Sequence, residues 1–399
     1  MSATAQPSPV RLARLIPALG VAQIISWGTL FYTIAVLGEA MRTELGISST
    51  SLFGAFTAGL LASGAVSPLV GRLVDTRGGR WVLGSGSVLG AAALALLASA
   101  HNYVTLFAGW MLAGLAMAAC LYDPAFATLH QLAGATYRRA VTALTLFGGF
   151  ASTVFWPLSQ WLLDSVGWRD TLWIYAALHA LVCLPVHAFF IPEGNANARA
   201  SEVVRAEATQ SERALRSATG VVFYAIAGAF AGAAFLSATL SAHLIELLKS
   251  AGLAARDAVL VASLVGPMQV AGRIAEFTFA RRISPRAAGV LAFGLMTAGF
   301  ACLVFVHGLS PLAFVFAVLY GWSNGVMTIV RGTVPAALFG RRNYGALLGR
   351  LALPAFVAKA VAPVAFTWLL AAGVTQGAAL WVLVAVSVAA LAGYRWAVR

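Results

Sequence analysis

Charged side chains are scarce in this sequence, where they make up 10% of 399 residues, against roughly 25% in soluble globular proteins. Lysine is the rarest charged residue. Only Lys249 and Lys359 occur, and neither follows a glycine. The Gly-Lys pair of a P-loop is therefore absent, which excludes an ATP-hydrolysing motif of that type. The cysteines Cys120, Cys183 and Cys302 lie far apart inside apolar stretches, which argues against a disulfide framework and favours a packing role.

Patterns typical of enzymes and metal sites are also missing. No zinc-protease helix, Cys/His cluster or nucleophile elbow stands out. His130, His179 and His187 show no ligand spacing, and we interpret them as interfacial or packed residues. The sequence therefore predicts a protein that is not an enzyme and that needs no cofactor and no metal.

Apolar residues dominate instead, at 60% of the chain with a mean hydropathy of +0.86. They form twelve runs, many reaching the ~20 residues that span hydrocarbon. The first run, at about residues 15–37, exceeds the core of a secretory signal, which is about 7–15 residues long. We expect it to be an uncleaved first helix. The sequence predicts an all-α membrane protein with twelve transmembrane helices.

The net charge of +13 would suggest nucleic acid binding in a soluble protein. Here the basic residues sit in short clusters between apolar runs, on one side of the predicted membrane topology. Those clusters are Arg11 with Arg14, Arg77 with Arg80, Arg138 with Arg139, Arg281, Arg282 and Arg286, Arg341 with Arg342, and Arg395 with Arg399. The positive-inside rule then places both termini in the cytoplasm. We expect a monomer in the plasma (bacterial inner) membrane, with no nucleic acid partner.

Two halves of the chain repeat each other. Six apolar runs precede a polar stretch at residues 192–217, and six follow it. The segment 71–75 (GRLVD), after the second run, is echoed by 272–276 (GRIAE) after the eighth. We predict an N-terminal six-helix bundle at 1–191, a cytoplasmic linker at 192–217 and a C-terminal six-helix bundle at 218–399. Parallel repeats of this kind imply a central path between them.

Residues 71–80 (GRLVDTRGGR) resemble the signature loop between the second and third helices of the major facilitator superfamily, and the resemblance covers essentially the full chain. It implies two pseudo-symmetric six-helix bundles. It also implies that the glycine permits close helix packing, that the aspartate caps and pairs across the two halves, and that the basic residues hold the cytoplasmic side. The gating residues carried over from it are Arg72, Asp75, Arg80, Arg273 and Glu276.

A narrower resemblance points to the monocarboxylate and oxalate-formate transporter branch. It rests on residues 122–124 (YDP), on 167–169 (GWR) and on Lys359 midway through the eleventh helix, where oxalate exchangers carry a substrate-binding lysine. The branch's eighth-helix arginine is missing from residues 267–272 (PMQVAG), which argues against a two-cation dicarboxylate clamp. The resemblance implies a secondary active transporter of a small organic anion, a monocarboxylate, working by alternating access with proton symport or anion antiport.

Charged residues inside the apolar runs are the sharpest site signals. An ammonium at a helix centre costs about 2.5 kcal/mol or more unless it faces a cavity or a counter-ion. Lys359 should therefore face the central path and anchor an anionic substrate, or else pair with a carboxylate such as Asp123. Asp123 and Arg331 lie at similar depths in the fourth and tenth runs. They form either a proton-coupling switch or a static salt bridge.

Polar and aromatic residues complete the predicted site, although each could serve helix packing instead. The remaining candidate substrate contacts are Gln23, Trp27, Tyr32, Tyr122, His243, Gln269 and Asn324. A drug or metabolite efflux antiporter is the alternative transport function, but Trp110 stands where such antiporters carry an arginine. A non-transporting membrane sensor on the same fold is a third possibility.

Overall fold

The computed structural model describes residues 9–192, 220–279, 282–340 and 343–399. The predicted linker at 192–217 therefore lies almost wholly outside the described residues. Helices account for nearly all of what is described, with no strand there. This confirms the all-α prediction.

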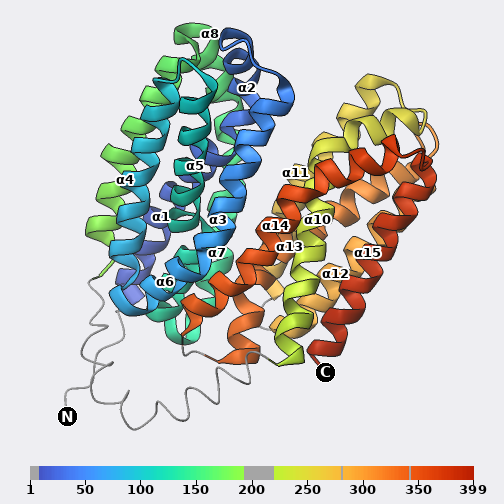
Figure 1. Ribbon diagram of the computed structural model, residues 1–399. Coiled ribbons are helices and arrows are strands. Elements are labelled where there is room, and N and C mark those ends of the chain that lie inside the picture. The colour runs from blue at the N-terminus through green and yellow to red at the C-terminus, as the bar shows by residue number, and fades with distance from the viewer. Residues whose placement is uncertain (1–8, 193–219, 280–281, 341–342) are drawn as a thin grey trace. The chain divides into compact units, whose positions relative to one another are not determined.

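The chain forms two compact units, drawn in Figure 1. Unit 1 comprises Met1–Ala208 and Arg341–Leu353, and unit 2 comprises Thr209–Gly340 and Pro354–Arg399. The boundary predicted from the repeat puts 341–353 in the second half, whereas the compact units group that segment with the first. The helix α14 (Tyr344–Ala371) thus begins in unit 1 and continues into unit 2 at Pro354.

Unit 1 contains the helices of the first half. They are α1 (Pro9–Ser26), η1 (Trp27–Phe31), α2 (Thr33–Glu44), α3 (Ser49–Arg77), α4 (Gly79–Ala98), α5 (Tyr103–Cys120), α6 (Tyr122–Ala133), η2 (Gly134–Thr136), α7 (Tyr137–Gly149), α8 (Ala151–Leu178), η3 (His179–Cys183) and η4 (Val186–Phe190). The helix α5 packs between α3 and α4, and α4 also packs on α8. The blue to green part of Figure 1 shows these helices running alongside one another.

Unit 2 contains α10 (Val221–Ser250), α11 (Ala255–Phe279), α12 (Pro285–Val304), α13 (Pro311–Phe339), the larger part of α14, and α15 (Gln376–Ala397). The helix α13 packs against both α11 and α12, while α15 packs against α10 and α12. Its core is filled by large apolar side chains such as Phe230, Phe293 and Phe316.

Short polar residues start several helices, and glycines end them. Ser48, Asn102 and Thr375 each accept a hydrogen bond from the backbone N–H three residues on, which satisfies one free donor of the first turn. Gly46 (φ 62°) and Gly373 (φ 86°) follow helix ends in the left-handed region, which favours glycine. These local signals mark the ends of the helices at which they occur.

Ten helical stretches within the described residues are long and apolar enough to cross a membrane. One of them, Tyr103–Phe190, runs for 88 residues, far more than one crossing needs. Gly134 (φ 51°) and Gly167 (φ 79°) interrupt it with non-helical backbone and divide it into three. Taken with the nine other stretches, these three are consistent with the predicted twelve spans.

Candidate functional site

Five aromatic side chains of unit 1 are connected by ring contacts, and we call this group the aromatic wall. Its members are Trp27, Phe31, Tyr32, Tyr122 and Trp156. The Trp27 ring lies 5.1 Å from Tyr122 and 5.3 Å from Phe31, centroid to centroid. Tyr32 packs edge-on against Phe31 at 5.4 Å and Trp156 at 6.1 Å. Three of the predicted substrate contacts, from parts of the chain about 90 residues apart, therefore come together. Phe31 and Trp156 join them without having been predicted.

The first side of the wall depends on an irregular helix turn. η1 is a π turn in which the Tyr32 N–H donates to the Trp27 carbonyl, five residues back, at 3.0 Å. In an α-helix, residues five apart point in different directions, whereas a π turn brings them to the same face. The π turn thus places the Tyr32 ring beside that of Trp27 in a tilted arrangement, with the ring centroids 6.3 Å apart.

The second side is placed by a helix break. The extended backbone of Leu121 (φ −82°, ψ −160°) separates α5 from α6, so Tyr122 and Asp123 open a new helix. A methyl group at position 148 would overlap the Tyr122 hydroxyl, so Gly148 leaves room for that ring. The sequence places Tyr122 within the fourth apolar run, and the structure opens a new helix at that residue.

Two polar atoms beside the wall have no hydrogen-bond partner among the described residues. Gln23 donates from Nε2 to the Cys120 carbonyl at 2.7 Å, but its Oε1 is buried without a donor. The indole Nε1 of Trp27 is likewise buried without an acceptor. Buried polar atoms are usually paired, so these two are candidate ligand contacts.

Asp123 borders a small cavity in unit 1 of about 10 Å³, which is close to the size needed for one water molecule. Its other lining residues include Ser67, Gly71, Gly345 and Gly349. Asp123 is half-buried at this cavity.

The start of α14 docks closely on α3 within unit 1. Asp75 accepts hydrogen bonds from the backbone N–H groups of Gly345 at 2.9 Å and Ala346 at 2.8 Å. A Cβ at Gly345 would overlap the Gly71 carbonyl, and a Cβ at Gly349 would overlap the carbonyl of Ser67. Small residues spaced four apart on both helices therefore let the two backbones meet.

Three aromatic rings secure the same end of α14. Tyr344 stacks on His130 with centroids 4.1 Å apart, and its hydroxyl lies 3.0 Å from the hydroxyl of Tyr137. Tyr137 meets the His130 ring edge-on at 4.9 Å. All three side chains are buried. Together with Asp75, for which the signature loop implied a capping role, they define a docking site for the first residues of α14. The sequence did not indicate the three rings as members of this site, because they are remote in the chain.

The other predicted residues lie in unit 2 or on the surface of unit 1. Lys359 is midway along α14, with its Nζ 5.8 Å from the Phe356 ring centroid. His243 on α10 contacts the Pro363 carbonyl through Nε2 at 3.2 Å. The residues Gln269, Arg273 and Glu276 are on α11, Asn324 and Arg331 are on α13, and Arg72 and Arg80 are on α3 and α4.

Asp123 and Arg331 belong to different units, so their predicted pairing stays a prediction. The same holds for the predicted ion pair of Lys359 with Asp123. No group of three or more potential metal ligands occurs among the described side chains.

The sequence matches the Major Facilitator Superfamily over residues 19–309. The chain belongs to this superfamily of transporters. A comparison with curated proteins gives no match. The protein is therefore a multi-pass integral membrane transporter for small molecules, and the resemblance of residues 71–80 to the superfamily's signature loop agrees with the match.

Solved structures show the same fold at low sequence identity. The human organic anion transporter MFSD10 is 16% identical, covers 99% of this chain and 100% of its own, and has a TM-score of 0.70. The E. coli fucose:proton symporter FucP is 14% identical, with 98% of each chain covered and a TM-score of 0.71. The proton:xylose symporter XylE is 13% identical, with 96% of each chain covered and a TM-score of 0.74. These similarities show the fold alone. They do not show whether the chain belongs to the monocarboxylate branch.

Proposed function

We propose that this transporter moves a small organic anion, a monocarboxylate, across the membrane by alternating access. The observation that carries the proposal is Lys359, the one lysine in the middle of an apolar span, next to Phe356. A fixed ammonium in hydrocarbon is costly unless it has an anionic or aqueous neighbour. The human relative named as an organic anion transporter is consistent with a solute of this charge.

The aromatic wall of unit 1 would supply apolar contacts to a small solute. Aromatic faces bind the hydrocarbon part of a small molecule, and a few polar atoms fix its orientation. The Trp27 Nε1–H can donate to a ligand oxygen, and the Gln23 Oε1 can accept from a ligand hydroxyl. These contacts suit a molecule with a short carbon body and a polar group.

Asp123 is our candidate for proton coupling. Its carboxylate is half-buried beside the small cavity and close to the docked start of α14. Protonation would change the local charge where α3, α6 and α14 meet, so it could be linked to release of α14 from α3. Under this scheme a proton moves with the anion. Anion exchange without protons is the alternative.

A second candidate function is transport of a neutral hydroxylated solute. The neutral hydrogen-bonding atoms of Gln23 and Trp27 beside aromatic rings favour it, and both FucP and XylE are named as sugar symporters. This candidate gives Lys359 no role in binding.

Thermal shift followed by uptake tests the proposal. Purified protein would be heated with lactate, benzoate, fucose, xylose and a hydrophobic cation, since a ligand of the folded state raises Tm by mass action. Radiolabelled compounds that bind would then be offered to proteoliposomes with an imposed pH gradient. We expect a carboxylate to bind and to accumulate. Preferential sugar accumulation supports the second candidate, cation movement supports efflux, and binding without accumulation supports a sensor.

A further inference from the structure

Two π turns from distant parts of unit 1 meet at one hydrogen bond. η1 carries Thr29 and η3 begins at His179, and the Thr29 Oγ1 lies 2.8 Å from the His179 Nε2. Thr29 also donates its hydroxyl hydrogen to the Ile25 carbonyl at 2.8 Å. A hydroxyl has one hydrogen, so with that hydrogen on the Ile25 carbonyl we assign the bond to histidine as Nε2–H donating to Oγ1. In this assignment Nδ1 of His179 is the bare acceptor.

Packing alone does not account for a histidine here. Thr29 and His179 are both fully buried. The Nδ1 of His179 has no hydrogen-bond partner in the described part of the chain, and a Cβ at Gly90 would lie only 2.7 Å from it. A buried acceptor without a partner lowers stability, and a hydrocarbon side chain would fill the space without that loss. The Nε2–H contact to Thr29 is what the imidazole adds.

The bond to His179 depends on the shape of η1. Relaxation of a π turn to an α-helix removes one residue from the turn and rotates one flank against the other by about 100°. In the α-helical form, the Thr29–His179 hydrogen bond and the Trp27–Tyr32 ring contact could not both be present. A contact made in only one of two forms shifts the equilibrium toward that form. The His179 bond therefore favours the π form, which is the form that places Tyr32 beside Trp27.

We propose that His179 is a positioning residue for the solute site. Through Thr29 it holds η1 in the π form, and this sets the spacing of Trp27, Phe31 and Tyr32 in the aromatic wall. The inference rests on the proposed function only in that the wall touches the solute. His179 itself touches no solute. Its contribution is to determine the width of the surface against which the solute's carbon body packs.

Paired substitutions separate this role from general packing. Thr29→Val and His179→Leu remove the hydrogen bond at nearly constant volume, whereas Thr29→Ser keeps the hydroxyl and His179→Gln keeps an N–H at a similar distance. Ser87→Ala is the matched control. It breaks an equivalent buried bond, because the Ser87 Oγ lies 2.8 Å from the His187 Nδ1, and it leaves η1 untouched.

The first readout is independent of the solute. A cysteine replacing Tyr32 would be labelled with a small maleimide in a background where Cys302 is serine, since Cys120 and Cys183 are buried. Loss of one buried hydrogen bond should change the labelling rate about fivefold in Thr29→Val and His179→Leu. Thr29→Ser, His179→Gln and Ser87→Ala should stay close to the parent. A melting temperature for each variant shows that it is folded.

The second readout uses whichever solute the uptake screen identifies. We expect KM to rise about fivefold in Thr29→Val and His179→Leu with Vmax nearly unchanged, and the conservative variants to restore it. If Ser87→Ala changes labelling and KM as much as Thr29→Val does, or if neither changes in folded Thr29→Val, the positioning role is wrong. Because labelling needs no solute, a failure of the anion proposal leaves this test intact.

Discussion

Asp75 on α3 caps the first turn of α14 through Gly345, a residue 270 positions later in the chain. Its two carboxylate oxygens accept from the Gly345 and Ala346 N–H groups at 2.9 and 2.8 Å. The first N–H groups of a helix lack partners within the helix and carry partial positive charge, so a carboxylate there is doubly favourable. The contact joins the predicted gating aspartate to the helix that carries Lys359.

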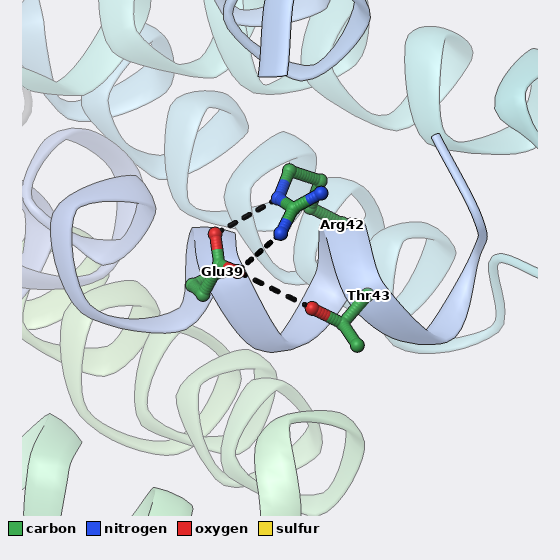
Figure 2. Close-up of polar contacts among 3 residues, drawn as sticks. All are labelled: Glu39, Arg42 and Thr43. Carbon is green, nitrogen blue, oxygen red and sulfur yellow. Dashed lines mark hydrogen bonds and ion pairs between the residues drawn. The ribbon is translucent and has the colours of Figure 1, made fainter. Parts of the chain in front are cut away.

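Removing this carboxylate should loosen the docked end of α14. We expect Asp75→Ala to cost on the order of 1–3 kcal/mol, because two charge-assisted hydrogen bonds are lost and the N–H groups stay half-buried. The measurement is Tm of the purified protein. Glu39→Ala is the control, since the Glu39 carboxylate meets Arg42 and Thr43 on the exposed face of α2 (Figure 2). Exposed pairs contribute about 0–1 kcal/mol, so equal losses in the two variants would contradict the capping role.

Close backbone approach makes Gly345 sensitive to any side chain. In Gly345→Ala the new methyl would overlap the Gly71 carbonyl, so we expect a loss of about 1–3 kcal/mol from overpacking. Gly377→Ala serves as the comparison, because a Cβ there meets nothing within 4 Å. The measurement is the Tm of both variants compared with that of the parent protein. An unchanged Tm in Gly345→Ala would show that α14 is not tightly held on α3.

Asp123→Asn should separate coupling from binding. The amide keeps the size of the carboxylate but cannot exchange a proton, so accumulation driven by a pH gradient should fall to the level of passive equilibration. Exchange of labelled for unlabelled solute across the proteoliposome membrane should persist. The two rates are measured on the same vesicles. Full pH-driven accumulation by Asp123→Asn would assign the coupling to another group.

The orientation inferred from the arginines predicts which loops face outward. His101 is exposed between α4 and α5, and Ser284 is exposed before α12, at the opposite end of the topology. A cysteine at His101 should react with an impermeant maleimide in intact cells, and one at Ser284 should react only after lysis. The reverse pattern would overturn the assignment of both termini to the cytoplasm.

Hydropathy and charge were enough to predict the fold class. Apolar runs of spanning length leave few alternatives in a bilayer, where only helices and closed barrels satisfy the backbone. The signature at residues 71–80 predicted the superfamily and drew attention to Asp75. Glycines such as Gly134 and Gly167 mark positions where the helical backbone is interrupted.

The details of the candidate site could not be predicted from sequence. A π turn has no sequence signal in a run that is apolar on all faces, so the contact of Tyr32 with Trp27 could not be predicted. His179 and His187 look like packed or interfacial histidines until the fold brings them to Thr29 and Ser87, 150 and 100 residues away. The division of α14 at Pro354 likewise follows from packing, since hydropathy is continuous through that proline.

The most direct test of the anion proposal compares the two lysines. Lys359→Met removes the central ammonium, while Lys249→Met removes an exposed one paired with Glu246 at 2.9 Å. Binding of a carboxylate and of a neutral analogue of similar shape would be measured for both variants and the parent protein. Loss of a charge-assisted bond of about 1.5–3 kcal/mol predicts roughly 10- to 150-fold weaker carboxylate binding by Lys359→Met alone, with neutral binding unchanged. If folded Lys359→Met binds and transports the carboxylate as well as the parent does, Lys359 is structural and the anion proposal is wrong.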